Sequence, residues 1–575
     1  ALEADPQFAL AHKNIGFLLA KEKNVDEAIF HFSEAARLLP DDIECRMEAA
    51  RLLDLEGEQD EALAIYREII EIDESDPRAY RGIGKILSAS QLEDDKTEAV
   101  AALKQATKLG FDDHITMLHA ATLYAEMKYV DLASDAFERA IELKPDSHEA
   151  VFSYANLVRD KGETQRAVDL FSRAIEINPK YAAAYSNLGN MLADNAMLED
   201  GIACAREAVA LQPDLVEAYN NLGSALQNAC RPVEALEAYT QALTLRPDDD
   251  AMLWNFALCL LATGQIENGW DLYGYGFASG QRKPLRPFPG LIWQGEDLSD
   301  KTIMITREQG LGDDLRFSTC FHDIVAQAKH VIIETDKRFV DLYKRTWPTA
   351  TVRAETGRST GLLNYREDEV DFDLTAPAGM VAARLRRSLA AFPRECRPLI
   401  ADAAKRQKAR DWLDSLGAGP KIGLTWRSGL RTPLRNMLAT EPVDWAPIQN
   451  IDGAILINLQ FGSPSDEIAE AAEKHGLVIH QMPDLDTHSD LDGTAALTAE
   501  LDFVLGLWNA ATEMAGSLGV PGVIYMPAHH SMQLGTGILP WHPSMRTYSV
   551  LPEFDRAGLV SHIAEDVRNL LPRKP

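Results

Sequence analysis

The fold of the first half of the chain is decided by "EAYNNLGSALQNACRPVEALEAYTQALTLRPD", residues 217–248. Small residues, one aromatic residue and one proline hold fixed positions in it, at Gly223, Ala235, Tyr239, Ala242 and Pro247. The same slots recur at Gly16, Ala28, Phe32, Ala35 and Pro40, and at Ala121, Ala133, Phe137, Ala140 and Pro145. Steps of 34 residues separate Pro145, Pro179, Pro213 and Pro247. A fixed period of this length predicts a solenoid of helix–turn–helix units.

The pattern resembles the tetratricopeptide repeat. Predicted units lie near residues 9–42, 43–76, 77–113, 114–147, 148–181, 182–215 and 216–249, and a degenerate eighth unit begins at 250. The third unit carries an insertion around "QLEDDK". "ALEADP" at the start resembles the tail of an earlier unit, so we expect a longer array in the native protein.

Such an array is expected to form a superhelix with a long concave groove, which in this class of protein holds a peptide or another protein. Asn187, Asn220 and Asn221 fall on the first helices of adjacent predicted units. Asparagine on that face is able to bind a peptide backbone without reading its sequence, so these three residues are the candidate peptide groove. Two alternatives stay open: the asparagines are ordinary solvent-facing residues, or the repeats only set a shape or a homo-oligomer contact.

The composition restricts the class of protein. A length of 575 residues predicts several domains. The net charge of -31 argues against nucleic acid as a main partner, because phosphate binding needs a basic field. The sequence has no apolar run long enough for a membrane span and no N-terminal signal pattern. The cysteines are scattered without metal-ligand spacing, which suits a reducing cytoplasm; they are Cys45, Cys204, Cys230, Cys259, Cys320 and Cys396.

After about residue 275 the period stops, and the Pro- and Gly-rich segment 280–295 indicates a linker. Strand-like runs then alternate with helical ones. The predicted strands are "TIMIT" (302–306), "HVIIET" (330–335), "TATVRA" (349–354), "FDLTA" (372–376), "KIGLTW" (421–426), "AILINLQ" (454–460), "GLVIH" (476–480), "LDFVLGL" (501–507) and "GVIYMP" (522–527). We therefore predict an α plus α/β protein, with an all-α repeat solenoid over 1–280 and two α/β lobes over 281–400 and 401–575.

The loop "REQGLGDD", which follows the first predicted strand, joins two glycines to two aspartates at an expected helix start. Gly310 and Gly312 let a ligand approach the main chain. Asp313 and Asp314 suit the helix dipole, but a carboxylate at the mouth of a cleft is also able to act as a general base. An acidic pair binds phosphate poorly. We therefore assign this loop, with Gln309, to the acceptor side of a cleft.

Two loops of the second lobe are the candidate donor side. "TWRSGLR" offers Arg427, Ser428, Gly429 and Arg431, and arginine beside a glycine-rich backbone suits an anionic sugar nucleotide. Gln460, after a later strand, is a candidate contact to the nucleotide or the sugar.

The second of these loops begins "NAATEMAGSLG" and starts a helix. A helix N-terminus is a ready anion site, so a donor phosphate is expected at its first residues; these are Asn509, Ala510, Ala511 and Thr512. The alternative is an ordinary capped helix that packs on the sheet.

Several segments, taken in order, resemble the lipopolysaccharide heptosyltransferases and their repeat-fused relatives. They are "EQGLGD", "WQGEDLSDKTIMI" (293–305), "KIGLTWRSG" (421–429), "LINLQFG" (456–462), "LDFVLGLWNAATEMAGSLGVPGVIYMP" (501–527) and "WHPSMR" (541–546). The resemblance covers nearly all of residues 290–550. It implies the two-lobed glycosyltransferase fold known as GT-B, sugar transfer with inversion, and Asp313 as the catalytic base.

The chain departs from the heptosyltransferases at one helix start, where Trp508, Asn509 and Glu513 stand at the family's Asp, Thr and His. A neutral Asn there resembles repeat-fused transferases that attach a nonulosonic acid, such as pseudaminic acid, from its CMP-activated form to Ser or Thr of flagellin. The resemblance therefore implies flagellin as acceptor. Arg427, Arg431 and Arg435 suit a donor sugar that bears a carboxylate.

A metal-independent transfer, with no cofactor beyond the nucleotide sugar, is expected because the sequence has no DxD motif in a strand–loop context. His529, His530 and His542 are assigned to a loop that lines the cleft. Two other readings stay open. One is a non-catalytic repeat scaffold or chaperone with a degenerate transferase half, and the other is a transferase that acts on lipid or polysaccharide.

Overall fold

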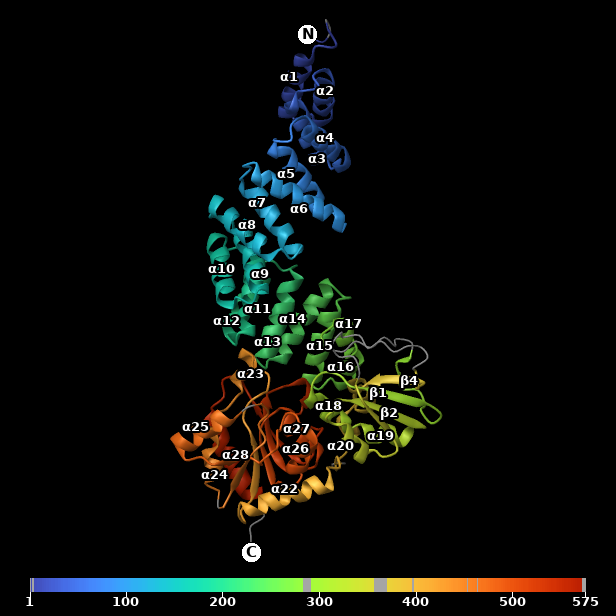
Figure 1. Ribbon diagram of the computed structural model, residues 1–575, viewed down its shortest axis with the longest axis vertical. Helices are drawn as coiled ribbons and strands as arrows, with labels where there is room; N and C mark the ends of the chain where they lie inside the picture. Colours follow the sequence, from blue (N-terminus) through green and yellow to red (C-terminus); the bar gives the residue numbers. More distant parts are fainter. Residues whose placement is uncertain are drawn as a thin grey trace. The chain divides into compact units, whose positions relative to one another are not determined.

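The computed structural model describes residues 2, 5–282, 291–355, 370–395, 398–451, 453–462 and 464–570 (Figure 1). Contacts between residues divide the chain into two compact units, Ala1–Leu188 and Gly189–Pro575. Cys396 and the 283–290 part of the predicted linker lie outside the described residues.

The first unit consists of paired helices (Figure 1). The helices are α1 (Ala9–Lys21), α2 (Val25–Leu38), α3 (Ile43–Glu56), α4 (Gln59–Ile72), α5 (Pro77–Ser88), α6 (Glu93–Lys108), α7 (His114–Glu126), α8 (Val130–Leu143), α9 (His148–Asp160), α10 (Thr164–Ile177) and α11 (Ala182–Asp194), which crosses the division between the units. Each pair begins at the residue where a predicted repeat unit begins. The predicted helix–turn–helix solenoid is confirmed.

The recurring small and aromatic slots face each other in the repeats. A Cβ added at Gly16 would lie 2.9 Å from the ring of Phe32, and one at Gly82 would lie 2.5 Å from the ring of Tyr66. Phe32 is fully buried. The small residue is therefore required because the aromatic ring fills the space that its side chain would take.

The second unit begins with the remaining repeat helices. They are α12 (Leu198–Leu211), α13 (Val216–Asn228), α14 (Pro232–Leu245), α15 (Asp250–Ala262), α16 (Ile266–Leu272) and α17 (Tyr275–Ala278). In α13 and α14 the same fit recurs, since a Cβ at Gly223 would lie 2.7 Å from the ring of Tyr239.

A parallel four-stranded sheet follows, in the order β3-β2-β1-β4. Its strands are β1 (Thr302–Thr306), β2 (His330–Thr335), β3 (Thr351–Ala354) and β4 (Leu374–Pro377). The helical segments around it are α18 (Leu311–Ser318), α19 (Phe321–Gln327), α20 (Val340–Thr346), α21 (Ala378–Leu385) and η4 (Leu389–Ala391). β1 pairs with both β2 and β4, so the "REQGLGDD" loop follows one of the two central strands.

The last part of the chain forms a parallel six-stranded sheet in the order β10-β9-β8-β5-β6-β7. Its strands are β5 (Lys421–Thr425), β6 (Ile455–Asn458), β7 (Ile479–His480), β8 (Phe503–Leu507), β9 (Gly522–Pro527) and β10 (Met545–Val550). The helical segments are α22 (Ala403–Ser415), α23 (Pro433–Met437), η5 (Pro442–Trp445), α24 (Ala446–Gln449), α25 (Ser465–His475), α26 (Leu491–Thr498), α27 (Ala510–Ser517), η6 (Ser531–Gln533) and α28 (Arg556–Leu570). The predicted parallel sheets with helices are confirmed, and β10 is an additional strand.

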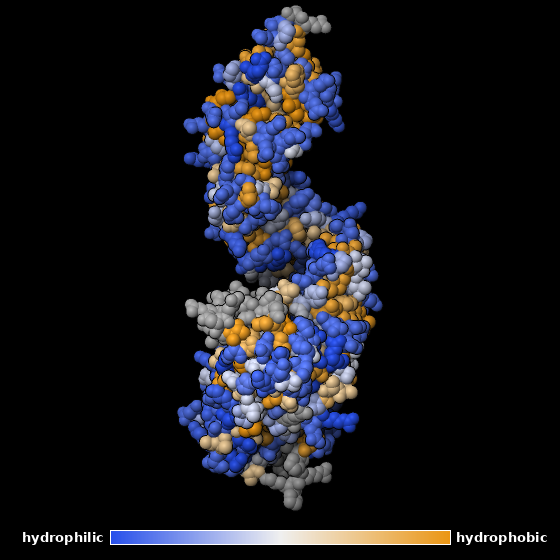
Figure 2. Space-filling model, turned by 90° about the vertical axis from the view of Figure 1, so that its right-hand side faces the viewer, coloured by the Kyte–Doolittle hydropathy of each residue, from blue (hydrophilic) through white to orange (hydrophobic). Residues whose placement is uncertain are grey.

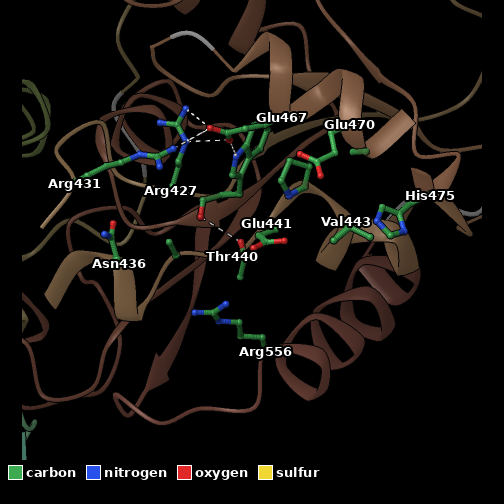
Figure 3. Close-up of a pocket in the computed structure, with 14 residues that line it drawn as sticks. Arg427, Arg431, Asn436, Thr440, Glu441, Val443, Glu467, Glu470, His475 and Arg556 are labelled. Atoms are coloured by element: carbon green, nitrogen blue, oxygen red, sulfur yellow. Dashed lines mark hydrogen bonds and ion pairs between the residues drawn. The ribbon is translucent and has the colours of Figure 1, made fainter. Parts of the chain in front are cut away.

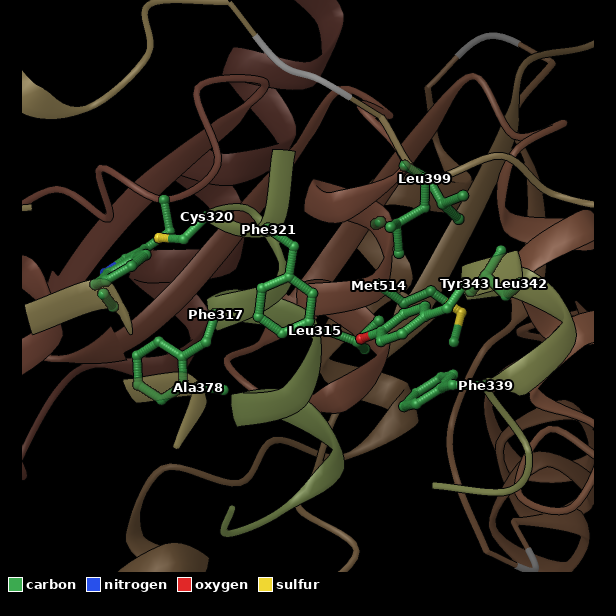
Figure 4. Close-up of a cluster of buried hydrophobic side chains, with 14 of the residues drawn as sticks. Leu315, Phe317, Cys320, Phe321, Phe339, Leu342, Tyr343, Ala378, Leu399 and Met514 are labelled. Carbon is green, nitrogen blue, oxygen red and sulfur yellow. The ribbon is translucent and has the colours of Figure 1, made fainter. Parts of the chain in front are cut away.

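One hydrophobic core joins the parts of the second unit. It contains Trp254 and Trp270 from the last repeats, Leu315 and Phe317 from α18, and Met514 from α27. Figure 4 shows Met514 lying among side chains of α18 and α20, next to Tyr343. The last repeats and the two sheets therefore share one hydrophobic cluster, and a second cluster lies between the other side of the second sheet and α28.

Hydrophilic side chains cover most of the face seen in Figure 2, and hydrophobic ones form separate patches between them. Among the described residues, no helix is both long and apolar enough to cross a membrane.

Candidate functional site

Buried ion pairs hold the loop after β1 in place. Arg307 is 2% exposed, and it pairs with Asp314 (Nε to Oδ2, 3.1 Å) and with Asp336 (Nη1 to Oδ2, 3.2 Å). Glu308 is also buried and pairs with Arg282, from the end of the helical array. These contacts fix both ends of the loop and leave its tip at the surface.

Asp313 is the exposed acid of this loop, with a side chain 32% exposed. Its Oδ2 accepts a hydrogen bond from the Gly310 N–H at 3.2 Å, and its Oδ1 pairs with Arg316 Nη1 at 2.9 Å. Gln309 and Gly310 beside it are exposed, and Gln309 has a left-handed backbone with φ of 59°. Asp313 lies in the first turn of α18, as predicted.

Asp314 does not reach the surface, so its assignment to the cleft is corrected. It is 2% exposed and accepts a hydrogen bond from Thr335 Oγ1 at 2.8 Å. Burial raises its pKa to about 6, although Arg307 opposes the shift. Adjacent helical residues point in directions about 100° apart, so one acid of the pair faces outward and the other faces the sheet.

A buried charge network, absent from the sequence-based assignment, connects α18 to α27. Arg316 donates to Glu513 Oε1 from Nε (2.8 Å) and from Nη2 (2.6 Å), and its guanidinium lies 4.7 Å from the ring of Trp508. Glu513 also pairs with buried His542. Burial disfavours the charged carboxylate, but Arg316 and His542 hold the pKa of Glu513 at about 2. The network reaches Asp313 through the remaining guanidinium nitrogen of Arg316.

Asn509 caps α27, as predicted. Its Oδ1 accepts from the N–H groups of Ala511 (2.9 Å) and Thr512 (3.3 Å). Its Nδ2 donates to Thr425 Oγ1 (2.8 Å) and to the Arg427 carbonyl (3.2 Å). The loops after β5 and β8 are thereby joined, but the cap already uses two of the N–H groups that were assigned to a donor phosphate.

Gln460 supports the loop after β5 through buried hydrogen bonds and does not face a cavity. It is fully buried, and its Oε1 accepts from the N–H groups of Trp426 and Arg427, both at 3.0 Å. Its Nε2 donates to the Arg427 carbonyl at 3.1 Å. The predicted contact between Gln460 and a ligand is therefore replaced by a supporting role.

Arg427 and Arg431 line a pocket of about 450 Å³. Figure 3 shows both arginines converging on Glu467, which pairs with Arg427 Nη2 at 2.7 Å and Arg431 Nη2 at 2.9 Å. Ser428 instead accepts from Arg435 Nη1 at 3.2 Å. Gly429 is exposed, with nothing within 4 Å of an added Cβ. The predicted donor loop thus carries positive charge that Glu467 partly neutralises.

In open parallel sheets, ligands bind outside the carboxyl ends of the strands, at the point where the strand order reverses. The strand orders of the two sheets therefore identify two expected binding positions. In the second sheet this point lies between β5 and β8, beside Arg427 and Asn509. In the first it lies between β1 and β4, beside the Asp313 loop. A Cβ added at Gly312 would lie 3.7 Å from Ala510 Cα. The loops from the two reversal points therefore meet.

The predicted peptide-groove residues are only partly available to a ligand. In the first unit, Asn187 Nδ2 donates to Asn156 Oδ1 at 2.8 Å. In the second unit, the buried side-chain oxygen of Asn220 has no hydrogen-bond partner among the described residues. Asn221 and Asn255 occupy the same repeat position, 34 residues apart.

The histidines separate into two environments. His529 and His530 line a pocket of about 260 Å³ whose other walls come from the repeats and from the second sheet, so it is a different cavity from the cleft to which they were assigned. His542 is buried at 1% exposure and belongs to the Glu513 network. Among the described residues, no three His, Cys, Asp or Glu side chains gather as metal ligands.

Comparison with known proteins confirms the repeats. Tetratricopeptide repeat profiles match residues 19–86, 116–147, 155–195 and 216–249. Protein FlbA of Caulobacter vibrioides is 35% identical over 302 residues, 51% of this chain and 50% of FlbA. The chain thus spans about half the length of this curated relative.

Two solved structures are also similar. YrrB, a TPR protein with an unusual peptide-binding site, shares 26% identity, with 32% of this chain and 95% of that chain covered and a TM-score of 0.30. A MamA protein shares 23% identity, with 30% and 92% covered and a TM-score of 0.27. The first half of the chain is a tetratricopeptide repeat array, a module that suits interaction with other proteins.

Proposed function

We propose that the chain is a protein O-glycosyltransferase with a GT-B arrangement, in which the repeats hold a protein acceptor and the α/β half transfers a sugar from a nucleotide donor to a Ser or Thr hydroxyl. The supporting observation is the close approach of α18 at Gly312 to α27 at Ala510, which brings together the helix starts that follow the reversal points of two parallel sheets. A partly exposed carboxylate, Asp313, lies at the start of α18, and Asn509 caps the start of α27.

In the proposed reaction, Asp313 takes the proton of the acceptor hydroxyl. The oxygen of that hydroxyl forms a bond to the anomeric carbon of the sugar at the same time. The bond from that carbon to the donor phosphate oxygen breaks, and the nucleotide leaves with the electron pair. The dipole of α27 and the nearby Arg427 would stabilise the negative charge that develops on the leaving group. Binding of the acceptor by the repeats would supply proximity.

The donor and acceptor are further parts of the proposal. The sequence resemblance supports a CMP-activated nonulosonic acid as donor and flagellin as acceptor. We expect CMP to raise the melting temperature of the purified chain, because a ligand that binds the folded state stabilises it by mass action. UDP, GDP and ADP serve as matched controls. A shift with UDP alone would replace the CMP assignment.

Asp313→Asn tests the catalytic assignment. Loss of a general base should lower the rate of transfer to flagellin by about 10²–10⁴-fold. Circular dichroism should stay unchanged, since Asp313 is partly exposed. Asp341→Asn, an exposed change in α20, is the control. A folded Asp313→Asn protein with the wild-type transfer rate would remove Asp313 from the mechanism.

A non-catalytic binding protein is the second candidate, and one set of contacts favours it. Asn509 accepts from the N–H groups of Ala511 and Thr512 at the start of α27, and Glu467 pairs with Arg427 and Arg431. Asp313 lines neither the pocket at Arg427 nor the pocket at His529. Absence of a melting shift with all four nucleotides would favour this candidate.

A further inference from the structure

The last repeats and the loops of the second sheet form between them a pocket of about 260 Å³, which we call the repeat-edge pocket. Asn228 of α13 and Leu258 of α15 line it on the repeat side. Met437 of α23 and His529, from the loop after β9, line the other side. Leu434 and Met437 also pack against the buried cluster of the last repeats. The pocket is therefore built into the junction between the repeats and the second sheet.

The repeat side of this pocket belongs to the face on which the sequence predicts a peptide groove. Residues seven apart on a helix lie two turns apart on nearly the same face. Asn228 follows Asn221 by seven residues on α13, and Ala262 follows Asn255 by seven residues on α15. Asn228 and Ala262 both line the pocket. The repeat-edge pocket therefore lies at the end of the predicted groove, where the repeats meet the second sheet.

The lining of the repeat-edge pocket is mainly apolar. Leu258, Met437 and Pro527 supply apolar surface, together with the buried residues Ala262 and Ala528. The volume is below the roughly 300–1,000 Å³ of pockets that enclose a whole drug-sized ligand. Large apolar side chains that fill pockets supply much of the binding free energy of protein complexes. Size and lining therefore suit one large apolar side chain of a longer polypeptide.

Arg435 supplies a positive charge at this pocket and is exposed. Its Nη1 donates to Ser428 Oγ at 3.2 Å, and no carboxylate among the described residues pairs with it. The described lining contains no Asp or Glu, although the net charge of the chain is -31. By contrast, the pocket of Figure 3 is lined by Glu441, Glu467 and Glu470. A ligand carboxylate would therefore meet a cation in the repeat-edge pocket and no repelling acid in its lining.

We propose that the repeat-edge pocket binds a polypeptide segment in which a large apolar side chain lies close to an acidic one. The apolar side chain would enter the pocket, the carboxylate would pair with Arg435, and the main chain would continue along the repeats past Asn228. The proposal rests on the part of the proposed function in which the repeats hold a protein, and it does not depend on sugar transfer. The repeats would then select a partner by its sequence at this position, which asparagine contacts to a peptide backbone do not do.

Selection from a random peptide library displayed on phage, with the full chain as bait, tests this proposal. We expect the enriched peptides to share a large apolar residue within one or two positions of Asp or Glu. In fluorescence polarisation, alanine at the apolar position should weaken binding about tenfold or more, because a side chain that fills a pocket is a typical hot spot. Asn or Gln at the acidic position should weaken binding about two- to fivefold, as expected for an exposed ion pair.

Variants of the chain locate the binding of these peptides. Leu258→Glu places a carboxylate in the wall of the pocket and should abolish the enrichment. Asn228→Trp fills the pocket from a partly exposed position and should also abolish it, which keeps the test valid if Leu258→Glu does not fold. Arg435→Met should keep the apolar preference and remove the acidic one. Thermal unfolding of each variant shows whether it is folded.

The controls are Leu253→Glu, at another partly buried position of α15 that does not line the pocket, and Arg546→Met, which breaks the ion pair with Asp566. Both should enrich the same peptides as the wild type. Peptides without a shared apolar residue, or an enrichment that persists in folded Leu258→Glu or Asn228→Trp, would overturn the proposal. Binding of the apolar anion 8-anilinonaphthalene-1-sulfonate without any enriched peptide would replace the polypeptide with a small ligand.

The melting series with nucleotides separates this proposal from sugar transfer. Peptide enrichment that is lost in Leu258→Glu, without a melting shift for any nucleotide, supports the pocket assignment and favours the non-catalytic binding protein. A melting shift without peptide enrichment contradicts the pocket assignment and leaves the transferase proposal in place.

Discussion

The loop after β1 and the loop after β5 both follow a central strand of a parallel sheet and both carry charged residues, but different contacts hold them. Arg307 and Glu308 anchor the β1 loop through ion pairs that are almost fully buried. The β5 loop is held by neutral Gln460, and its arginines pair near the surface with Glu467. Buried charges cost more to disturb than exposed ones, so the first loop should be the more rigid of the two.

The largest effect is expected from Arg307→Met. It leaves Asp314 and Asp336 without their buried cation, which should cost about 3–5 kcal/mol of unfolding free energy. Denaturant unfolding measures the loss. Arg206→Met, which breaks an exposed pair with Glu234 in the repeats, is the control. A smaller loss than in that control would show that the β1 loop does not depend on its buried charges.

Glu513→Gln should cost about 3 kcal/mol at neutral pH, because buried Arg316 and His542 lose their negative partner. The pKa of Glu513 is about 2 in the folded state and ordinarily 4.5. Its contribution is therefore complete above pH 4.5 and is lost as the pH falls towards 2. Unfolding curves of wild type and variant should converge over this window. A difference in unfolding free energy that stays constant at all pH values would contradict the assignment of a charged Glu513. The control is Glu470→Gln, a change at an exposed position of α25.

Gln460→Leu tests the neutral support of the β5 loop. The change leaves the buried N–H groups of Trp426 and Arg427 without an acceptor and should cost about 2 kcal/mol. Chemical denaturation is the measurement, with the exposed change Gln407→Leu in α22 as control. Stability equal to that of the control would mean that the loop finds other acceptors.

The smallest effect is expected from Glu467→Gln. Its carboxylate is 28% exposed and pairs with Arg427 and Arg431 near solvent, so the loss should be about 1 kcal/mol or less. High salt should reduce the difference from wild type further. A loss as large as that of Arg307→Met would remove the contrast between the two loops.

The sequence predicts the repeats well, because each unit repeats the same local contacts every 34 residues. Buried strands are also readable as apolar runs. β10 is missed because its central residues, Arg546 to Ser549, are polar or only partly buried at the sheet edge. Local patterns do not reveal which of two adjacent acids faces the solvent, and this explains the error at Asp314.

Local sequence patterns also do not predict ion pairs between residues that are far apart in the chain. Arg316 and Glu513 are 197 residues apart, and nothing near either residue in sequence indicates the other. The pairing of Arg427 with Glu467 spans 40 residues and likewise changes the role expected of the arginine. The sequence therefore predicts that the candidate residues lie near the ends of strands, where the structure has them, but the partners of their charges required the fold.

The pair between Arg282 and Glu308 has a consequence for how such a chain could be assembled in evolution. Arg282 lies against the rings of Tyr273 and Phe277 at the end of the helical array, and its carboxylate partner begins the loop of the first sheet. A recombination breakpoint after residue 282 would leave Glu308 buried in the new protein without its partner Arg282. When relatives exchange their repeat arrays, the last repeat helices should therefore stay with the two sheets. The segment that is inherited as one piece would then begin within the repeats.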